Sequence, residues 1–179
     1  SDTPPYSYAG AKFSSATLAP EMFHELKPGE AEALKAYWQG AGEELRSKVA
    51  PMVSVAGKQF VVKSFLSPAG KPVREGLPYE LEEAAEEVDL WSLGALAFLL
   101  LAGEPLVSST RDDDCASGDA AEFLYRWEDT RKLKRLKNIA DAAANDLVGE
   151  LLQREPSTRQ RVAKLLKDHP FFHPESGDA

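Results

Sequence analysis

The segment from Trp91 to Ala102 constrains the fold more than any other part of the chain, because it is apolar almost throughout. A helix that is apolar on every face is normally buried on every face. Acidic residues crowd the sequence just before it, as suits the positive end of a helix dipole, and Gly103 is a natural residue to end it. We therefore predict a helix over residues 82–102 that stands at the buried centre of a mainly helical domain.

The region before this helix has a different pattern. Apolar residues from Leu34 to Val49 recur at helical spacing and predict one amphipathic helix over residues 30–49. Alternating apolar residues on either side of Ala56-Gly57-Lys58 predict a β-hairpin. A second turn is expected at 68–71, followed by a short edge strand at 72–73.

Further helices are predicted after the apolar segment, separated from it by a polar loop. The last of them has Ser157 or Thr158 near its N-cap and ends before His169-Pro170, because a residue that precedes proline is disfavoured in a helix. The expected ranges are 119–128, 130–138, 141–153 and 158–168.

Composition narrows the range of functions. The net charge of −8 argues against nucleic acid or an anionic membrane as a partner. The single cysteine, Cys115, excludes an internal disulfide and a multi-cysteine zinc site. The apolar run that ends at Ala102 is too short for a membrane span, which needs about 20 residues. The three histidines have no spacing suited to a metal site or a nucleophile, so we predict no metal site.

Three motif blocks follow one another along the chain. The first is Ala19-Pro20-Glu21, which alone indicates no more than a turn before a helix. The second runs from Asp89 through Trp91-Ser92 to Gly94, then through the apolar segment to Gly103-Glu104-Pro105. The third contains Arg154-Glu155-Pro156-Ser157-Thr158-Arg159 and ends at His169-Pro170-Phe171-Phe172. Separately, the last two are compatible with an ordinary buried helix and with two helices joined by a proline turn.

Together and in this order, the blocks resemble the protein kinase family, from the end of the activation segment to the end of the catalytic domain. The resemblance covers residues 13–23 and about 78–172. It implies a mainly α fold: the helical bundle of a kinase C-terminal lobe around a central buried helix, with a small β-hairpin in an insertion.

The resemblance also implies structural roles for individual residues. Glu21 would be the buried carboxylate of the Ala19-Pro20-Glu21 motif, and Arg159 would be its guanidinium partner in a bidentate ion pair. Asp89 would accept backbone N–H bonds from the catalytic loop. Trp91 would pack beneath the activation segment, and Gly94 would let a neighbouring element approach closely.

The wall of a substrate pocket is implied just before the first block. Ser14 aligns with the threonine that usually lies near the catalytic aspartate of Ser/Thr kinases. Thr17 stands where many kinases carry a tyrosine, so this wall departs from the common pattern. The pocket candidates are Ser14, Ser15, Thr17 and Leu18.

The sequence contains no His-Arg-Asp catalytic loop, no Asp-Phe-Gly motif, no glycine-rich loop and no Val-Ala-Ile-Lys strand. We therefore predict no catalytic, cofactor-binding or metal-binding residue in this chain, and inactivity of the chain alone. On the resemblance, ATP and Mg²⁺ are expected for the full-length kinase. The upstream N-lobe and catalytic loop of the same polypeptide would be its partners.

The domain organisation departs from the family in one place. Residues 1–179 are interpreted as a partial kinase domain, and residues 24–78 as an atypical insertion that holds the predicted helix and hairpin. The insertion is either a decorated loop packed on the lobe or a docking surface, since long ordered loops are often functional. Residues 1–12 and 173–179 are expected to be flexible ends.

Two functions stay open at this point. The chain is either the substrate-binding half of a Ser/Thr protein kinase, a phosphotransferase, or a pseudokinase or scaffold module that binds protein partners without catalysis. Either would act on a protein substrate or a regulatory partner. The expected location is intracellular, in the cytoplasm.

Overall fold

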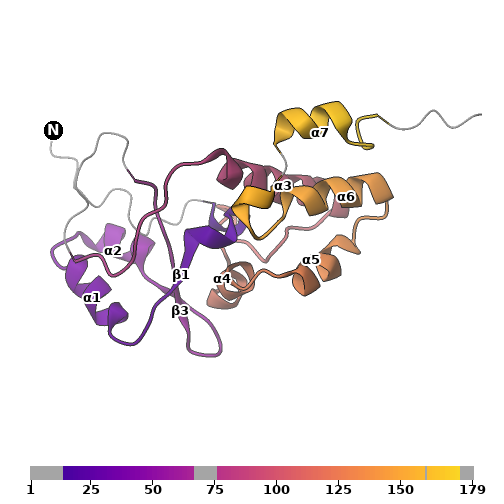
Figure 1. The fold of residues 1–179 in the computed structure, drawn as a ribbon. Coiled ribbons are helices and arrows are strands. Elements are labelled where there is room, and N and C mark those ends of the chain that lie inside the picture. The colour runs from indigo at the N-terminus through magenta and orange to yellow at the C-terminus, as the bar shows by residue number, and fades with distance from the viewer. Residues whose placement is uncertain (1–13, 67–75, 160, 174–179) are drawn as a thin grey trace, which may run out of the picture. The chain divides into compact units, whose positions relative to one another are not determined.

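The computed structural model describes residues 14–66, 76–159 and 161–173. Its described part is mainly helical with a small three-stranded sheet, which confirms the predicted fold class (Figure 1). The chain forms two compact units.

Some predictions fall on residues outside the described ranges. They are the turn at 68–71, the short strand at 72–73, the flexible end at 1–12, and all of the flexible end at 173–179 except His173. These stay predictions.

The first unit comprises residues 1–16, 20–84 and 107–126 and is built on the sheet. The sheet has the order β1-β3-β2, with antiparallel pairing throughout. The predicted hairpin is confirmed: Met52 pairs with Phe60 across a turn in which Gly57 has a φ of 78°. The strands are β1 (Phe23–Glu25), β2 (Met52–Val53) and β3 (Gln59–Val62).

The predicted single helix over 30–49 is wrong, because two helices occupy this range. They are α1 (Glu30–Tyr37) and α2 (Glu43–Val49). Gly40 between them has a φ of 96°, in the left-handed region that favours glycine and ends a right-handed helix. The apolar spacing runs through the break, so periodicity alone did not reveal it.

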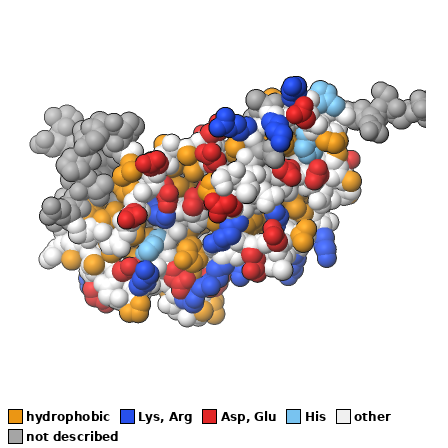
Figure 2. Space-filling view, viewed as in Figure 1, with side chains coloured by type: hydrophobic (Ala, Val, Ile, Leu, Met, Phe, Trp, Pro, Cys, Tyr) orange, Lys and Arg blue, Asp and Glu red, His pale blue; other side chains and the backbone are white. Residues whose placement is uncertain are grey.

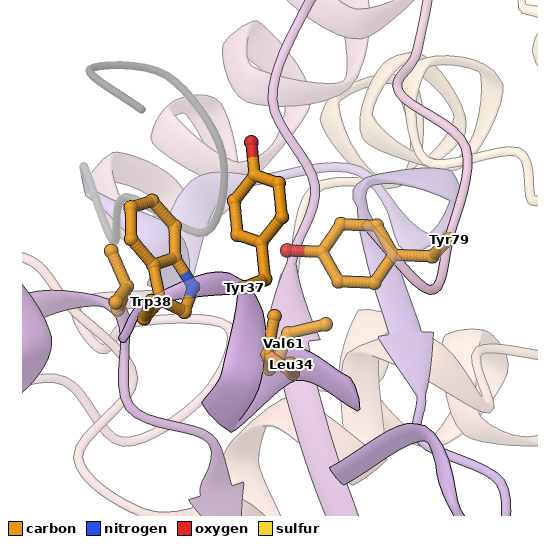
Figure 3. Close-up of a cluster of buried hydrophobic side chains, with 6 residues drawn as sticks. Leu34, Tyr37, Trp38, Val61 and Tyr79 are labelled. Atoms are coloured by element: carbon orange, nitrogen blue, oxygen red, sulfur yellow. The ribbon is translucent and has the colours of Figure 1, made fainter. Parts of the chain in front are cut away.

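An aromatic cluster joins α1 and α2 to the sheet. Tyr37 and Trp38 meet edge to face, with 5.0 Å between ring centroids. Figure 3 shows Tyr79 with its hydroxyl directed toward Tyr37. The cluster consists of Leu34, Tyr37, Trp38, Val49, Val61 and Tyr79.

The phenol of Tyr79 makes the stability of this cluster sensitive to alkali. Burial raises the pKa of Tyr79 above its ordinary value, and the neighbouring Tyr37 raises it further. The fold therefore favours the neutral phenol, and the unfolded chain loses its proton first, at about pH 10. The contribution of Tyr79 is constant below that pH and falls as the pH rises above it.

We expect Tyr79→Phe to flatten the loss of stability above about pH 10, where an ordinary phenol ionises. At neutral pH the variant should unfold near the wild-type midpoint, because the Tyr79 hydroxyl has no hydrogen-bond partner among the described residues. Urea unfolding of both proteins at neutral and alkaline pH measures the difference. If the wild type and Tyr79→Phe lost the same stability in alkali, this would contradict the burial of a neutral phenol at Tyr79.

Helix α4 (Gly118–Tyr125) packs against the sheet in the first unit. The side chain of Ser117 caps it by accepting a hydrogen bond from the backbone N–H of Ala120. The carboxylate of Asp119 accepts a 3.0 Å bond from the backbone N–H of Val55 in the hairpin turn. The start of α4 is thereby fixed to the hairpin.

The second unit comprises residues 17–19, 85–106 and 127–179 and is helical in its described part. Helices α3 and α6 lie side by side, as Figure 1 shows, and α5 packs on α6. The helices are α3 (Glu86–Ala102), α5 (Asp129–Leu136), α6 (Ala142–Leu151) and α7 (Val162–Asp168).

Helix α3 begins later than predicted, at Glu86, and ends as predicted. Glu82 forms a β-bridge with Phe65, so its backbone is held extended and cannot enter a helix. At the other end, Gly103 has a φ of 72° and donates its N–H to the carbonyl of Leu99.

The prediction that α3 is buried on every face is wrong for the described structure. One face is buried, with Trp91 and Phe98 fully enclosed. The other face carries leucines, among which Leu100 is 75% exposed. We call this set the leucine face of α3: Leu93, Leu96, Leu99, Leu100 and Leu101.

The last helix starts later than predicted. Residues Pro156–Thr158 form a 3-10 turn, and Arg159 is extended, so α7 begins at Val162 rather than after Ser157 or Thr158. It ends at Asp168, before His169-Pro170, as predicted.

Candidate functional site

The guanidinium of Arg159 is the centre of the candidate site. Its side chain is buried and donates three hydrogen bonds to backbone carbonyls: 2.9 Å to Gln153, 2.8 Å to Glu87 and 3.1 Å to Arg154. Its carbon Cζ lies 5.2 Å from the centroid of the Trp91 ring, at a distance suited to a cation–π contact. One residue thus joins the start of α3 to the turn that follows α6.

The carbonyl partners of Arg159 were missed by sequence reasoning, which gave it only the carboxylate of Glu21. A backbone carbonyl is present at every position, so no residue type marks it. Glu21 is half-buried in the 3-10 turn Pro20–Met22, next to the buried Ala19 and Pro20. Because Glu21 belongs to the first unit and Arg159 to the second, their ion pair stays a prediction.

Trp91 packs against a second tryptophan inside the helical unit. Its ring meets that of Trp127 almost perpendicularly, with 5.3 Å between centroids and an interplanar angle of 83°. Trp127 donates its indole N–H to the carbonyl of Leu152 and accepts a bond from Arg154 on its own carbonyl. Trp127 and Arg159 therefore both hydrogen-bond to the turn after α6, Arg154 of that turn bonds to Trp127, and Trp91 packs against Trp127 and Arg159.

Gly94 allows α3 and α6 to approach closely. A Cβ atom at this position would lie 2.8 Å from Cβ of Leu151 and 3.0 Å from Cδ2 of Leu152. Such distances are not tolerated between carbon atoms, so the helix crossing requires glycine. Gly94 and Trp91 come from the second motif block and Arg159 from the third. The fold places Gly94 against Leu151 and Leu152, and Trp91 beside Arg159.

The predicted pocket residues are divided between the two units. Ser15 is fully buried, and its hydroxyl donates to the carboxylate of Asp114 and accepts from the N–H of Cys115. Its hydroxyl is therefore engaged in holding the loop at 113–115. Thr17, in the other unit, accepts a 3.1 Å bond from Ser92 on its carbonyl.

The remaining pocket candidates give no further support. Ser14 is exposed with a φ of 45°, and Leu18 is half-buried. The pocket stays a prediction. Asp89, which would anchor the catalytic loop, has an exposed side chain on α3, and its role also stays a prediction.

Acidic and basic side chains are interspersed over the face shown in Figure 2. Within the described residues, no group of three or more His, Cys, Asp or Glu side chains is placed to hold a metal ion. None of the described helices has both the length and the apolar character needed to cross a membrane.

Comparison with known proteins supports the kinase resemblance. The chain is 33% identical to Aurora kinase C of Mus musculus over 92 residues, which is 51% of this chain and 29% of that protein. It is 35% identical to the serine/threonine-protein kinase Aurora-1 of Arabidopsis thaliana over 100 residues, which is 54% of this chain and 31% of that protein. It is 32% identical to the serine/threonine-protein kinase DCLK3 of Mus musculus over 121 residues, which is 64% of this chain and 14% of that protein. No protein-family model matches the chain.

These matches confirm the resemblance that the three motif blocks indicated. Between about half and two thirds of the chain is similar to a portion of serine/threonine protein kinases. The chain spans less than a third of the length of each of these relatives.

Proposed function

We propose that this chain is the C-terminal half of a Ser/Thr protein kinase domain. It would supply the substrate platform and the structural anchor for ATP-dependent phosphorylation of proteins by the full-length protein. The observation that carries the proposal is the assembly of Trp91, Gly94 and Arg159, in which residues from the second and third motif blocks pack together. Catalysis by a kinase depends on positioning and electrostatic stabilisation, and a rigid lobe provides the positioning.

The leucine face of α3 supports a role inside a larger domain. It borders a wholly apolar hollow of about 400 Å³ that is lined by leucines of α3, α6 and α7 and by Phe171 and Phe172. Contiguous apolar surface of this kind is rarely left in water. In the proposed kinase, upstream helices of the same polypeptide would cover it.

Nucleotide binding tests the proposal. The chain alone should bind no MgATP, because it contains none of the motifs that hold the phosphates and magnesium. A full-length protein that includes it should bind MgATP, and isothermal titration calorimetry of both proteins measures the contrast. Tight binding by the chain alone would contradict the first expectation, and absence of binding by the full-length protein would contradict the second.

The second candidate function is that of a pseudokinase or scaffold. It is favoured by the first unit, in which the insertion forms its own aromatic cluster on its own sheet rather than a short loop. The upstream sequence separates the two functions. An intact His-Arg-Asp loop and Asp-Phe-Gly motif there would favour the kinase, and substituted aspartates would favour the scaffold.

A further inference from the structure

A hollow on the first unit is lined entirely by residues of the insertion. It has a volume of about 400 Å³ and lies among α1, α2 and the hairpin. Its apolar lining includes Leu34, Trp38 and Val49, which also belong to the aromatic cluster and are at most 4% exposed. The three side chains are therefore packed in the core of the cluster, and the hollow lies against its edge.

Two cations stand at the rim of this hollow. Lys35 comes from α1 and Arg46 from α2, and both side chains are exposed. Neither forms an ion pair with another described residue, whereas Lys48 on α2 pairs with Glu44 at 2.8 Å. One acidic residue, Glu32, shares the lining, so the charged rim carries an excess of positive charge in a chain of net charge −8.

We propose that this hollow docks a peptide segment of a protein partner, one that carries a bulky apolar side chain beside acidic residues. The apolar side chain would lie over Leu34 and Trp38, where it would be removed from water. The acidic side chains would pair with Lys35 and Arg46, and carboxylate pairing with arginine is favoured by its bidentate geometry.

The size and chemistry of the hollow select this occupant. The volume of about 400 Å³ lies within the range of about 300–1,000 Å³ that is typical of small-molecule pockets, so the hollow has room for a bulky side chain but not for a folded domain. An apolar floor with a few polar groups at its edge gives both affinity and orientation. The positive rim favours an acidic segment over a basic one, since like charges placed together are repelled.

This docking role does not depend on the proposed kinase function, because none of the lining residues belongs to the three motif blocks. It would serve an active kinase by holding a substrate or regulator, and it would serve a scaffold in the same way. A failure of MgATP binding by the full-length protein therefore leaves this proposal intact, and a failure of peptide docking leaves the kinase proposal intact.

A random peptide library displayed on phage and selected against the 179-residue chain provides the probe. We expect the enriched peptides to combine Leu, Phe or Trp with neighbouring Asp or Glu. Their synthetic forms, measured by fluorescence anisotropy, should bind more weakly as salt rises, because ion pairs at an exposed rim are screened. Enrichment of peptides without acidic residues, or no enrichment, would overturn the proposal.

The double variant Lys35→Glu, Arg46→Glu should weaken binding of these peptides about tenfold or more, because it places like charges against them. Both side chains are exposed, so the variant should fold, and thermal melting checks this. Lys48→Glu is the control: it makes one charge reversal of the same kind on α2, outside the hollow, and should leave binding unchanged. Equal weakening by the control, or no weakening by the double variant, would overturn the proposal.

Discussion

Replacement of Arg159 by alanine should destabilise the chain by about 3–5 kcal/mol, because each lost hydrogen bond to a charged group costs about 1.5–3 kcal/mol and water restores part of the loss. The substitution removes three hydrogen bonds to the carbonyls of Gln153, Glu87 and Arg154, and it leaves those carbonyls without that donor. It also removes the cation that lies over Trp91. Urea unfolding followed by circular dichroism measures the loss.

Two companion variants separate the possible causes. Arg159→Lys keeps the charge but not the planar fork of donors, so it should lose a substantial part of the same stability. Arg161→Ala makes the same truncation two residues away at an exposed side chain and should change stability by no more than about 0.5 kcal/mol. Equal midpoints for Arg159→Ala and Arg161→Ala would show that the guanidinium network does not hold the turn after α6.

Replacement of Gly118 by alanine should also be severe, with a loss of about 3 kcal/mol from overpacking. A Cβ atom at Gly118 would lie 2.1 Å from the carbonyl carbon of Val53 and 2.3 Å from the backbone nitrogen of Ser54. The obstacle is backbone rather than the end of a flexible side chain, so the hairpin must move away from α4. That movement would break the bond from the N–H of Val55 to Asp119.

The matched control for Gly118→Ala is Gly42→Ala. Gly42 also stands at the start of a helix and has an ordinary φ of −61°, and an added Cβ there would meet no heavy atom within 4 Å. The substitution should be nearly neutral, because alanine fits that backbone without strain. Thermal melting of the two variants compares them directly. Equal melting temperatures would contradict the close approach of α4 to the hairpin.

The parts of the fold that the sequence predicted are those with a local signal. The continuous apolar run indicated α3, alternation around Gly57 indicated the hairpin, and Gly103 marked the end of α3. The sequence also contains Gly40, but because the amphipathic pattern continues across it, the pattern did not predict that its left-handed conformation ends a helix there. Local patterns therefore predict most helices and strands, but they can fail to locate a break within a helical segment.

The features that the sequence did not predict depend on contacts between distant segments. Gly118 resembles any glycine near a helix start, and only the position of Val53 makes it irreplaceable. Ser15 was predicted to line a pocket, yet its hydroxyl binds Asp114 and Cys115 about 100 residues away. Likewise, the apolar run predicted that α3 would be buried, but it did not indicate which segments would cover each face, and the leucine face is exposed.

Phosphoryl transfer by the full-length protein tests the central proposal most directly. A protein that contains this chain, incubated with MgATP labelled on the γ-phosphate and with serine- and threonine-containing protein substrates, should transfer the label to their hydroxyl groups. The chain alone should transfer none. Absence of transfer by a folded full-length protein that has the upstream catalytic motifs would contradict the kinase assignment of function.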